Sequence, residues 1–235
     1  ALRGQGRTFG RGWGAVWGCS MGEWAGEVRA RWAGQMESLG WANGQAAIDG
    51  IIRAYSEPHR RYHGLSHLDY IFTELDRHEA SLTEPARCWM AAWYHDIIYD
   101  PRAKNNEAQS ADRASAELPG LGADPALVNR TASLIRATAS HQSGGSDFDD
   151  ALFLDIDFSI LGAPDAIYDA YAAGVREEYS WAPGLLYRQG RRAFLKPAQA
   201  AARTFLTDIF EDRMGEKARA NMRREFLALG GKLGR

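Results

Sequence analysis

The sequence predicts an all-α fold, arranged as a single-domain helical bundle. Apolar residues recur at spacings of about 3.6 along most of the 235 residues, which is the period of an amphipathic helix. Gly and Pro separate these segments, and no stretch alternates apolar and polar residues convincingly as a strand would. A hydrophobic content of 45% is enough for one sizeable core. We therefore expect one helical domain over residues 21–235.

The first twenty residues differ from the rest of the chain. They are rich in Gly, Arg and Trp, lack helical periodicity and end directly before Met21. We expect residues 1–20 to be a disordered extension or a translation artefact, outside the helical domain.

Charge and cysteine content exclude several classes of protein. The formal net charge is -2, so no overall field would recruit a nucleic-acid polymer or an anionic membrane. No apolar run approaches the length of a membrane span and no signal peptide is visible. The two cysteines, Cys19 and Cys88, do not form a disulfide framework, and a cytoplasmic location is expected. The eight tryptophans permit a homodimer surface but are equally explained as core.

Helical segments are expected to follow one another from residue 23. Apolar spacing predicts helices over residues 23–38 and 45–55, and Ser66 with Asp69 resembles the capping pair of a third helix that continues to about residue 80. Thr83 is a candidate N-cap for a fourth helix, with Pro85 in its first turn.

The second half of the chain gives the same pattern. We expect helices after Asn105 or Asn106, with Glu107 in the first turn, and from Asp124-Pro125 to His141. Others are expected over residues 149–160, up to Glu178-Tyr179, and in two or three segments bounded by Pro183 and Pro197.

The helix expected after Thr83 contains the dipeptide His95-Asp96 in an otherwise apolar run. A helix that is apolar all round is buried, and an unpaired carboxylate is costly in such surroundings. On its own the dipeptide is most simply a hydrogen-bonded core pair. Histidine and aspartate are also good ligands for a divalent cation, so further ligands are sought elsewhere in the chain.

The remaining histidines extend this hypothesis. Three of the six lie within nine residues of one another, upstream of the dipeptide; the full set is His59, His63, His67, His78, His95 and His141. Together with His95-Asp96 and one later aspartate, His67 would complete a site of two imidazoles and two carboxylates. This mixture of nitrogen and oxygen donors suits Mn²⁺, Fe²⁺, Co²⁺ or Mg²⁺ better than cations that prefer thiolates.

Five motifs in this order resemble the HD superfamily of metal-dependent phosphohydrolases, and a bacterial branch of predicted HD phosphohydrolases in particular. They are EPHRRYHGLSHL (57–68), AWYHDIIYD (92–100), NEAQSA (106–111), LDIDFSILG (154–162) and VREEY (175–179). The resemblance implies a helical bundle of HD-domain type. It also implies hydrolysis of a phosphoester or phosphoanhydride in a small phosphorylated substrate. The family resemblance alone points to a nucleotide as that substrate.

The resemblance further implies which residues bind the divalent cation, namely His67, His95, Asp96 and Asp157. Asp157 is preferred to Asp155 because related enzymes often follow the ligand aspartate with an apolar or basic residue and a small polar one, as Phe158-Ser159 do here. Asp155 would then orient a ligand. The identity of the cation stays open among Mn²⁺, Mg²⁺, Co²⁺, Fe²⁺ and Ni²⁺.

Catalytic roles follow from the same resemblance. Tyr62-His63-x-x-x-His67 is similar to a signature of cyclic-nucleotide phosphodiesterases, in which the earlier histidine protonates the leaving oxygen, although Gly64 stands where those enzymes have Asn. His63 would be this acid, or would only bind substrate phosphate. Glu107 would position the attacking water or bind a second cation. Alternatively, it has no catalytic role, because glutamate in the first turn of a helix is favoured by the positive helix end alone.

Two further kinds of residue have open roles. His141 would ligate a second cation, or would simply be a histidine that the negative end of its helix favours. Arg61 and Arg191 are the first candidates for binding phosphate, and each could equally be a surface charge or a structural ion pair. Arg60, Lys104 and Arg176 are further candidates for binding phosphate, and Arg176 could instead form an ion-pair lattice with Glu177 and Glu178. Two alternative functions remain, an HD-fold di-iron oxygenase and a non-catalytic module that binds a phosphorylated ligand.

Overall fold

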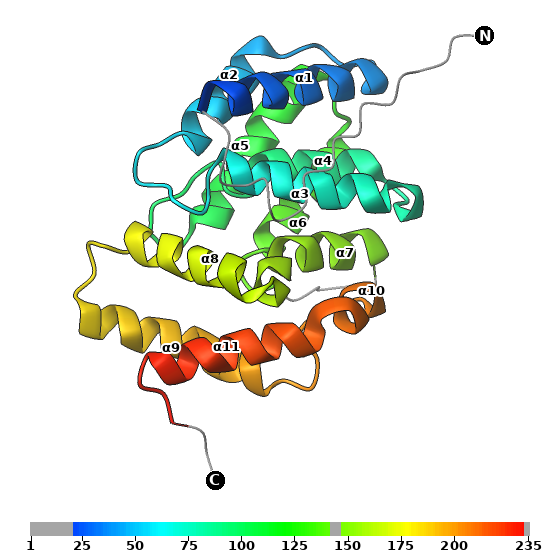
Figure 1. The fold of residues 1–235 in the computed structure, drawn as a ribbon. Helices are drawn as coiled ribbons and strands as arrows, with labels where there is room; N and C mark the ends of the chain where they lie inside the picture. The colour runs from blue at the N-terminus through cyan, green and yellow to red at the C-terminus, as the bar shows by residue number, and fades with distance from the viewer. Residues whose placement is uncertain (1–20, 142–146, 233–235) are drawn as a thin grey trace.

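The computed structural model describes residues 21–141 and 147–232. Within these two ranges all regular structure is helical, which confirms the predicted all-α class (Figure 1). The predicted extension over residues 1–20 lies outside the described residues. None of the described helices combines the length and the apolar character that crossing a membrane requires.

The helices follow one another through short connections. The first half of the chain forms α1 (Met21–Leu39), α2 (Gln45–Tyr55), α3 (Leu65–His78), the 3₁₀ turn η1 (Glu79–Ser81), α4 (Pro85–Tyr94), α5 (Asn106–Leu121) and α6 (Pro125–Ala137). The second half forms α7 (Phe148–Phe158), the 3₁₀ turn η2 (Ser159–Gly162), α8 (Asp165–Glu178), α9 (Gly184–Ala200), α10 (Asp208–Phe210), the π turn η3 (Glu211–Gly215) and α11 (Glu216–Ala228).

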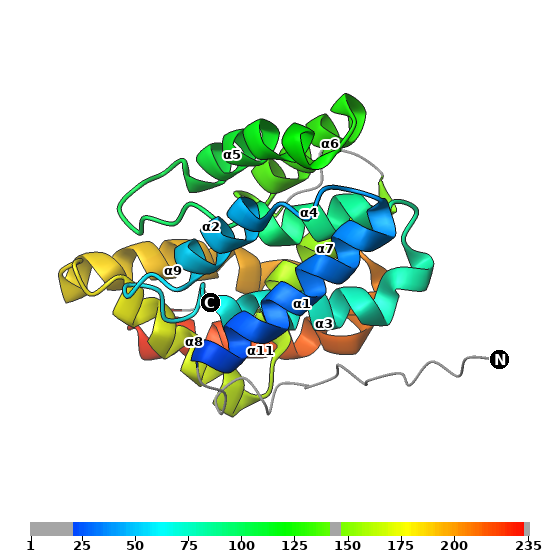
Figure 2. The ribbon, with the colours of Figure 1, turned by 90° about the horizontal axis from the view of Figure 1, so that it is seen from above.

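Helices α3, α4 and α7 form the centre of the bundle, where each packs against the other two. Helix α1 packs on α2 and α3, the α5–α6 pair packs on α4, and α9 pairs with α11. Figure 1 shows α1 and α2 at one end of the molecule and the α9–α11 pair at the other. Seen from above, α5 and α6 run along one side (Figure 2).

An aromatic cluster holds α1, α3 and α4 together. The ring of Trp93 in α4 packs against Trp32 of α1 and Phe72 of α3, with centroids 5.5 Å and 4.3 Å away. All three side chains are fully buried, and the Trp93 indole donates a hydrogen bond of 2.8 Å to Gln35. The burial of such large rings stabilises the contact of α1, α3 and α4, so the backbones that carry His67 and His95 are held by the core.

Helix α4 is shorter than predicted. It ends at Tyr94, so His95 occupies the C-cap position and Asp96 lies in the turn that follows. The prediction of one helix running through this dipeptide was therefore wrong, although both residues are at the centre of the molecule. The backbone N–H of His95 still donates to Ala91 at 2.8 Å, which completes the last helical hydrogen bond.

The start of α4 is also stabilised differently from the prediction. Pro85 occupies its first turn as expected, but Thr83 is not the N-cap. The backbone N–H groups of Thr83 and Glu84 donate to the carboxylate of Asp149 in α7, at 3.0 and 2.7 Å. Because this cap comes from another helix, the local sequence does not contain it.

Other helix boundaries show where local signals succeed. Asp124 caps α6 as predicted, accepting hydrogen bonds from the N–H groups of Ala126 and Leu127. The Ser66–Asp69 capping pair was wrong, because α3 starts at Leu65 and its N-cap is Gly64. Helix α6 ends at Ala137 rather than at His141, and Pro197 lies inside α9 rather than at its boundary.

Candidate metal centre

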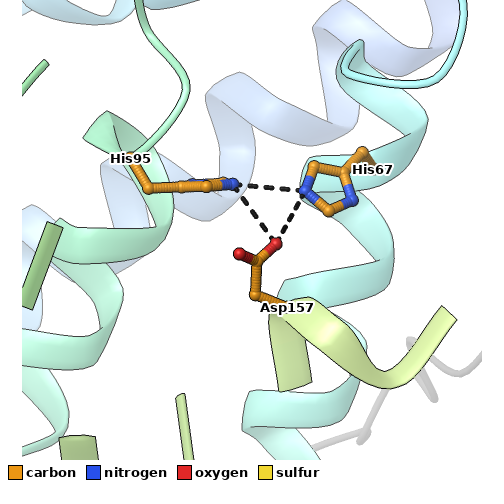
Figure 3. A group of neighbouring side chains, drawn as sticks. All are labelled: His67, His95 and Asp157. Carbon is orange, nitrogen blue, oxygen red and sulfur yellow. Dashed lines mark hydrogen bonds and ion pairs between the residues drawn. The ribbon is translucent and has the colours of Figure 1, made fainter. Parts of the chain in front are cut away.

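Four side chains from three separate segments meet at the centre of the bundle. Two imidazole nitrogens and two carboxylate oxygens converge at these separations: His67 Nε2 to His95 Nε2 3.2 Å, His67 Nε2 to Asp157 Oδ1 3.2 Å, His95 Nε2 to Asp96 Oδ2 3.3 Å, His95 Nε2 to Asp157 Oδ1 3.7 Å, and His67 Nε2 to Asp96 Oδ2 3.9 Å. Figure 3 shows His67, His95 and Asp157 pointing toward one another. These three residues could hold a metal ion, and Asp96 faces the same point.

Helix ends bring these donors together. His67 lies in the first turn of α3, His95 is the C-cap of α4, and Asp157 lies in the last turn of α7. The C-terminal end of a helix carries partial negative charge from its unpaired carbonyls. The ends of α4 and α7 therefore add to the attraction that the carboxylates exert on a cation, and the positive N-terminal end of α3 opposes it.

The donor atoms of His67, His95 and Asp157 lie close enough together to share a single ion. Donors at about 2.1 Å from one cation are separated by about 3.0 to 3.4 Å in octahedral or tetrahedral coordination, close to the separations found here. The Nδ1 of His95 donates to the carbonyl of Ala92 at 2.9 Å, so Nε2 is the nitrogen that faces the other donors. For His67, whose Nδ1 has no partner among the described residues, the ring is held by packing 4.9 Å from Tyr62.

The charge at this point is unbalanced without a cation. Both imidazoles are buried, and the Asp96 and Asp157 side chains are only 15% and 11% exposed. Within the described residues, the ion-pair partners of both carboxylates are histidines, with no Lys or Arg. Burial opposes the ionisation of both carboxyl groups, but the neighbouring histidines outweigh it and lower both pKa values. Burial also lowers the pKa of His95, but the Asp96 carboxylate raises it to about 9.

Of the four donors, Asp96 and Asp157 line a cavity of about 450 Å³. Four of the other residues that the sequence singled out also line it: His63, Glu107, His141 and Arg191. The structure thus brings two of the predicted ligands and these four residues to one cavity, while Arg61 and Asp155 lie elsewhere.

Asp155 does not orient a metal ligand, which corrects that interpretation. Its two carboxylate oxygens accept hydrogen bonds of 2.7 Å from the backbone N–H groups of Leu206 and Thr207, and one of 2.6 Å from the Thr207 hydroxyl. The carboxylate therefore anchors the segment before α10. Two residues along α7 turn a side chain by roughly 200°, which is why Asp155 and Asp157 face different neighbours.

His141 lies beside Asp157. Its Nε2 is 3.0 Å from Asp157 Oδ2, whereas Oδ1 of the same carboxylate faces His67. The ring of His141 also stacks on Phe158 at 4.3 Å. His141 has a φ of 50°, a left-handed conformation that costs a non-glycine residue about 1 kcal/mol. The backbone holds this strained conformation at the edge of the candidate centre, where the two oxygens of Asp157 contact different imidazoles.

Glu178 was interpreted as part of a surface lattice, and the structure corrects this. One carboxylate oxygen accepts hydrogen bonds from three consecutive backbone N–H groups, those of Arg61, Tyr62 and His63, at 2.7, 2.8 and 3.0 Å. The other oxygen is 2.7 Å from both His63 Nδ1 and the Tyr99 hydroxyl. We call this arrangement the Glu178 clamp. It holds the His63 ring by Nδ1, so that Nε2 is the nitrogen available to the cavity.

The Glu178 clamp is charged. Burial raises the pKa of Glu178, but His63 and the three N–H donors outweigh burial and bring it down to about 2. Burial lowers the pKa of His63, and the Glu178 carboxylate overcomes this and raises it. A sequence signal for Glu178 did exist, because it follows the buried Tyr171 and Val175 at seven and three residues, on the inner face of α8.

The arginines have roles different from those expected. The Arg61 side chain is 53% exposed and pairs with Glu177 at 3.1 Å, away from the cavity. Its neighbour Arg60 is buried and donates to the carbonyls of Asp96 and His63, at 2.7 and 3.1 Å. Arg60 thereby links the turn that carries a metal-facing carboxylate to the loop that carries His63.

Arg191 does line the cavity, but its charge is already compensated. The guanidinium bonds both oxygens of Glu225, at 2.8 and 3.0 Å, and lies 3.2 Å from the Tyr171 hydroxyl. An arginine that is paired in this way contributes less to binding an anion than a free one.

Comparisons of the chain with protein-family models, with curated proteins and with solved structures found no match.

Proposed function

We propose that this protein is a metal-dependent phosphohydrolase of HD-superfamily type, which cleaves a phosphoester or phosphoanhydride. The observation that carries the proposal is the convergence of two imidazoles with two carboxylates that line a cavity of about 450 Å³. Structural metal sites are closed by their protein ligands, whereas catalytic sites keep a position open to solvent or substrate.

The divalent cation would be held by His67 and His95 through Nε2 and by Asp96 and Asp157 through one oxygen each. When bound, such a cation supplies Lewis acidity, which activates water and stabilises negative charge on phosphoryl oxygens. The protein's contribution is to hold four donors from three helices in place before the ion arrives. Arg60 and the core contact at Trp93 support that arrangement from outside the cavity.

His63 is proposed as the general acid. The Nδ1–H of His63 donates a hydrogen bond to Glu178, so the proton on Nε2 of the protonated ring can be donated to a leaving oxygen in the cavity. The raised pKa of His63 favours the protonated form that this role needs. A positioned acid of this kind typically contributes about 10²- to 10⁴-fold in rate.

Glu107 is proposed to orient the attacking water. It lines the same cavity from the first turn of α5, and no ion pair to it is found among the described residues. Its carboxylate can accept a proton of a water molecule and direct the lone pair toward the phosphorus.

The proposal is tested by measuring phosphate release from metal-stripped protein given Mn²⁺, Mg²⁺, Co²⁺, Fe²⁺ or Ni²⁺. The substrates are phosphomonoesters, phosphodiesters, nucleotides and pyrophosphate. We expect release that depends on the cation and that falls by at least about 10³-fold in His67→Ala and Asp96→Ala. The control is His78→Ala, which removes an imidazole from the other end of α3 and should keep the activity. Metal-loaded protein that releases phosphate from none of these substrates would contradict the proposal.

One observation favours a second candidate, the di-iron oxygenase. The two oxygens of Asp157 contact different imidazoles, His67 and His141, as a carboxylate between two ions would. Measuring bound metal per chain in the native protein and in His141→Ala distinguishes the candidates. Two irons per chain, with no phosphate release, would favour the oxygenase. Binding of a phosphorylated ligand without turnover would favour a non-catalytic module.

A further inference from the structure

We propose that the cavity takes a phosphate ester of low charge whose leaving group is aromatic or otherwise apolar, and not a polyphosphate. The inference rests on the proposed function, because it assumes that the phosphate lies against the metal donors. Two observations carry it: the apolar side chains along one side of the cavity, and the small number of cationic groups that are free to bind phosphate.

Three neighbouring rings form this side of the cavity, which we call the aromatic wall: His141, Phe158 and Phe194. The ring of Phe158 lies 4.3 Å from that of His141 and 6.1 Å from that of Phe194, which it meets edge to face. Ile160 and Leu161 continue the apolar surface within the same cavity. Phe194 is 39% exposed although it is large and apolar, so part of its ring is available to a ligand.

The aromatic wall begins at the metal centre. His141 contacts the Asp157 carboxylate at 3.0 Å and stacks on Phe158 in the other direction. A ligand whose phosphate lies at the donors therefore has its ester group directed along these rings. Stacking of one planar ring on an aromatic side chain is typically worth about five- to a hundred-fold in affinity.

Among the described residues, few cationic groups line the cavity. Arg191 is bonded to Glu225, and Arg61 is turned outward toward Glu177. For Lys104, which also lines the cavity, no ion pair is found in the part of the chain that the structure describes. Glu107 adds a negative charge to the same cavity.

The charge of the ligand must match these groups. A phosphomonoester carries about −1.5 to −2 charges at pH 7, and every further phosphoryl group adds about one more. One bound divalent cation and Lys104 together carry three positive charges, which the carboxylates of Asp96, Asp157 and Glu107 already offset. Each phosphoryl group of a ligand therefore adds negative charge that these groups do not compensate, which disfavours a triphosphate more than a monoester.

The test is calorimetric binding of non-hydrolysable probes to the full chain, with Mg²⁺ held in fixed excess so that the probes do not strip the site. The probes are phenylphosphonate, methylphosphonate and methylenediphosphonate. We expect phenylphosphonate to bind about tenfold more tightly than methylphosphonate, and methylenediphosphonate to bind no more tightly than methylphosphonate. Equal affinities for phenyl and methyl, no binding of any phosphonate, or a preference for the diphosphonate would each overturn the inference.

Variants separate the two observations. Phe194→Ala should remove the preference for phenyl over methyl, whereas Phe148→Ala, which removes a ring of the same exposure from the start of α7, should keep it. Lys104→Ala should weaken both monophosphonates about equally, and Lys196→Ala should not. If Phe194→Ala keeps the phenyl preference, the aromatic wall is not the binding surface.

Failure of the inference is distinguishable from failure of the proposed function, because binding and turnover are measured separately. Phosphate release together with tight diphosphonate binding would leave the hydrolase proposal intact and overturn the ligand class. Selective phenylphosphonate binding without release from any ester would support the ligand class and overturn the hydrolase.

Discussion

Helices α4 and α7 pack side by side and carry a charged cluster at each end, and the two clusters are compensated in opposite ways. At their N-terminal ends, the buried guanidinium of Arg87 lies 2.8 Å from Asp147, 3.3 Å from Asp149 and 3.4 Å from Asp150. We call this group the arginine cluster. At their C-terminal ends, Asp96 and Asp157 face only histidines within the described residues.

The two clusters differ in whether their carboxylates have a permanently charged cation as a partner. The arginine cluster contains a permanent cation that pairs with each of its three carboxylates, and the group works as a structural link between the helices. The carboxylates of the candidate metal centre have only titratable partners, and a divalent cation from solution would compensate them better. The same helix pair thus contains a cluster built on a cation of its own and a cluster without a permanent cation.

The largest expected effect comes from comparing alanine substitutions at the two ends of α7. Asp157→Ala should lower cation-dependent phosphate release by at least about 10³-fold, because it removes a metal donor. Asp150→Ala, which removes a carboxylate from the arginine cluster on the same helix, should leave the rate within about twofold. Rates and bound metal are measured for both variants after circular dichroism has shown that they are folded. Equal losses of activity would mean that the two clusters do not differ in function.

The arginine cluster should affect stability instead. Arg87→Met should lower the free energy of unfolding by about 3–5 kcal/mol, because it leaves the buried Asp149 carboxylate without its cation. Denaturant unfolding measures this loss. At temperatures where the variant is folded, its cation stoichiometry should match that of the native chain, and a lost cation would show that the clusters are coupled.

A divalent cation should raise the free energy of unfolding only through the candidate metal centre and not through the arginine cluster. At a free concentration of 100 times its Kd, a cation that binds the folded state alone raises the free energy of unfolding by about 2.7 kcal/mol. We expect this increment in the native chain and in Arg87→Met, and none in Asp157→Ala. Thermal unfolding with and without a chelator measures it. An increment in Asp157→Ala would place the cation elsewhere.

The smallest effect concerns Glu178, a third buried carboxylate, which is compensated by hydrogen bonds. Glu178→Gln should lower the free energy of unfolding by about 1.5 kcal/mol at pH 7, as expected for losing charge-assisted hydrogen bonds. The pKa of Glu178 is depressed from 4.5 to about 2 in the folded protein. Its contribution is therefore fully present above pH 4.5 and is lost as the pH falls toward 2.

Urea unfolding of the native chain and Glu178→Gln between pH 7 and pH 2.5 measures that contribution. The difference between the two should shrink as the pH falls through this range. A difference that stays constant with pH would mean that the charge of Glu178 does not contribute.

Sequence patterns predicted most of the helices but not the caps that depend on distant residues. The apolar period located α2 at Gln45–Tyr55, and the Asp124-Pro125 pair located the start of α6, because both signals are local. The start of α4 is capped by Asp149, more than sixty residues along the chain. No local pattern contains that contact.

The candidate site shows the same division. Histidine and aspartate spacing, with the resemblance to HD phosphohydrolases, selected the four donors that the structure brings together. Arg60 was passed over in favour of Arg61 because two adjacent arginines look alike in sequence, and only packing decides which is buried. Glu178 was missed because a glutamate beside another glutamate resembles a solvated face. Its spacing from Val175 carried the information that it is buried.

The Glu178 clamp has a consequence for protein synthesis. A chain that leaves the ribosome presents His67, His95 and Asp96 first, then Asp157, and Glu178 later still. The backbone N–H groups of residues 61–63 gain their shared acceptor, the Glu178 carboxylate, only after α8 has been synthesised and has packed against the loop. A nascent chain that stops before α8 has all four proposed cation donors but lacks the carboxylate that orients His63. The proposed proton donor is thus oriented only when the last third of the molecule folds.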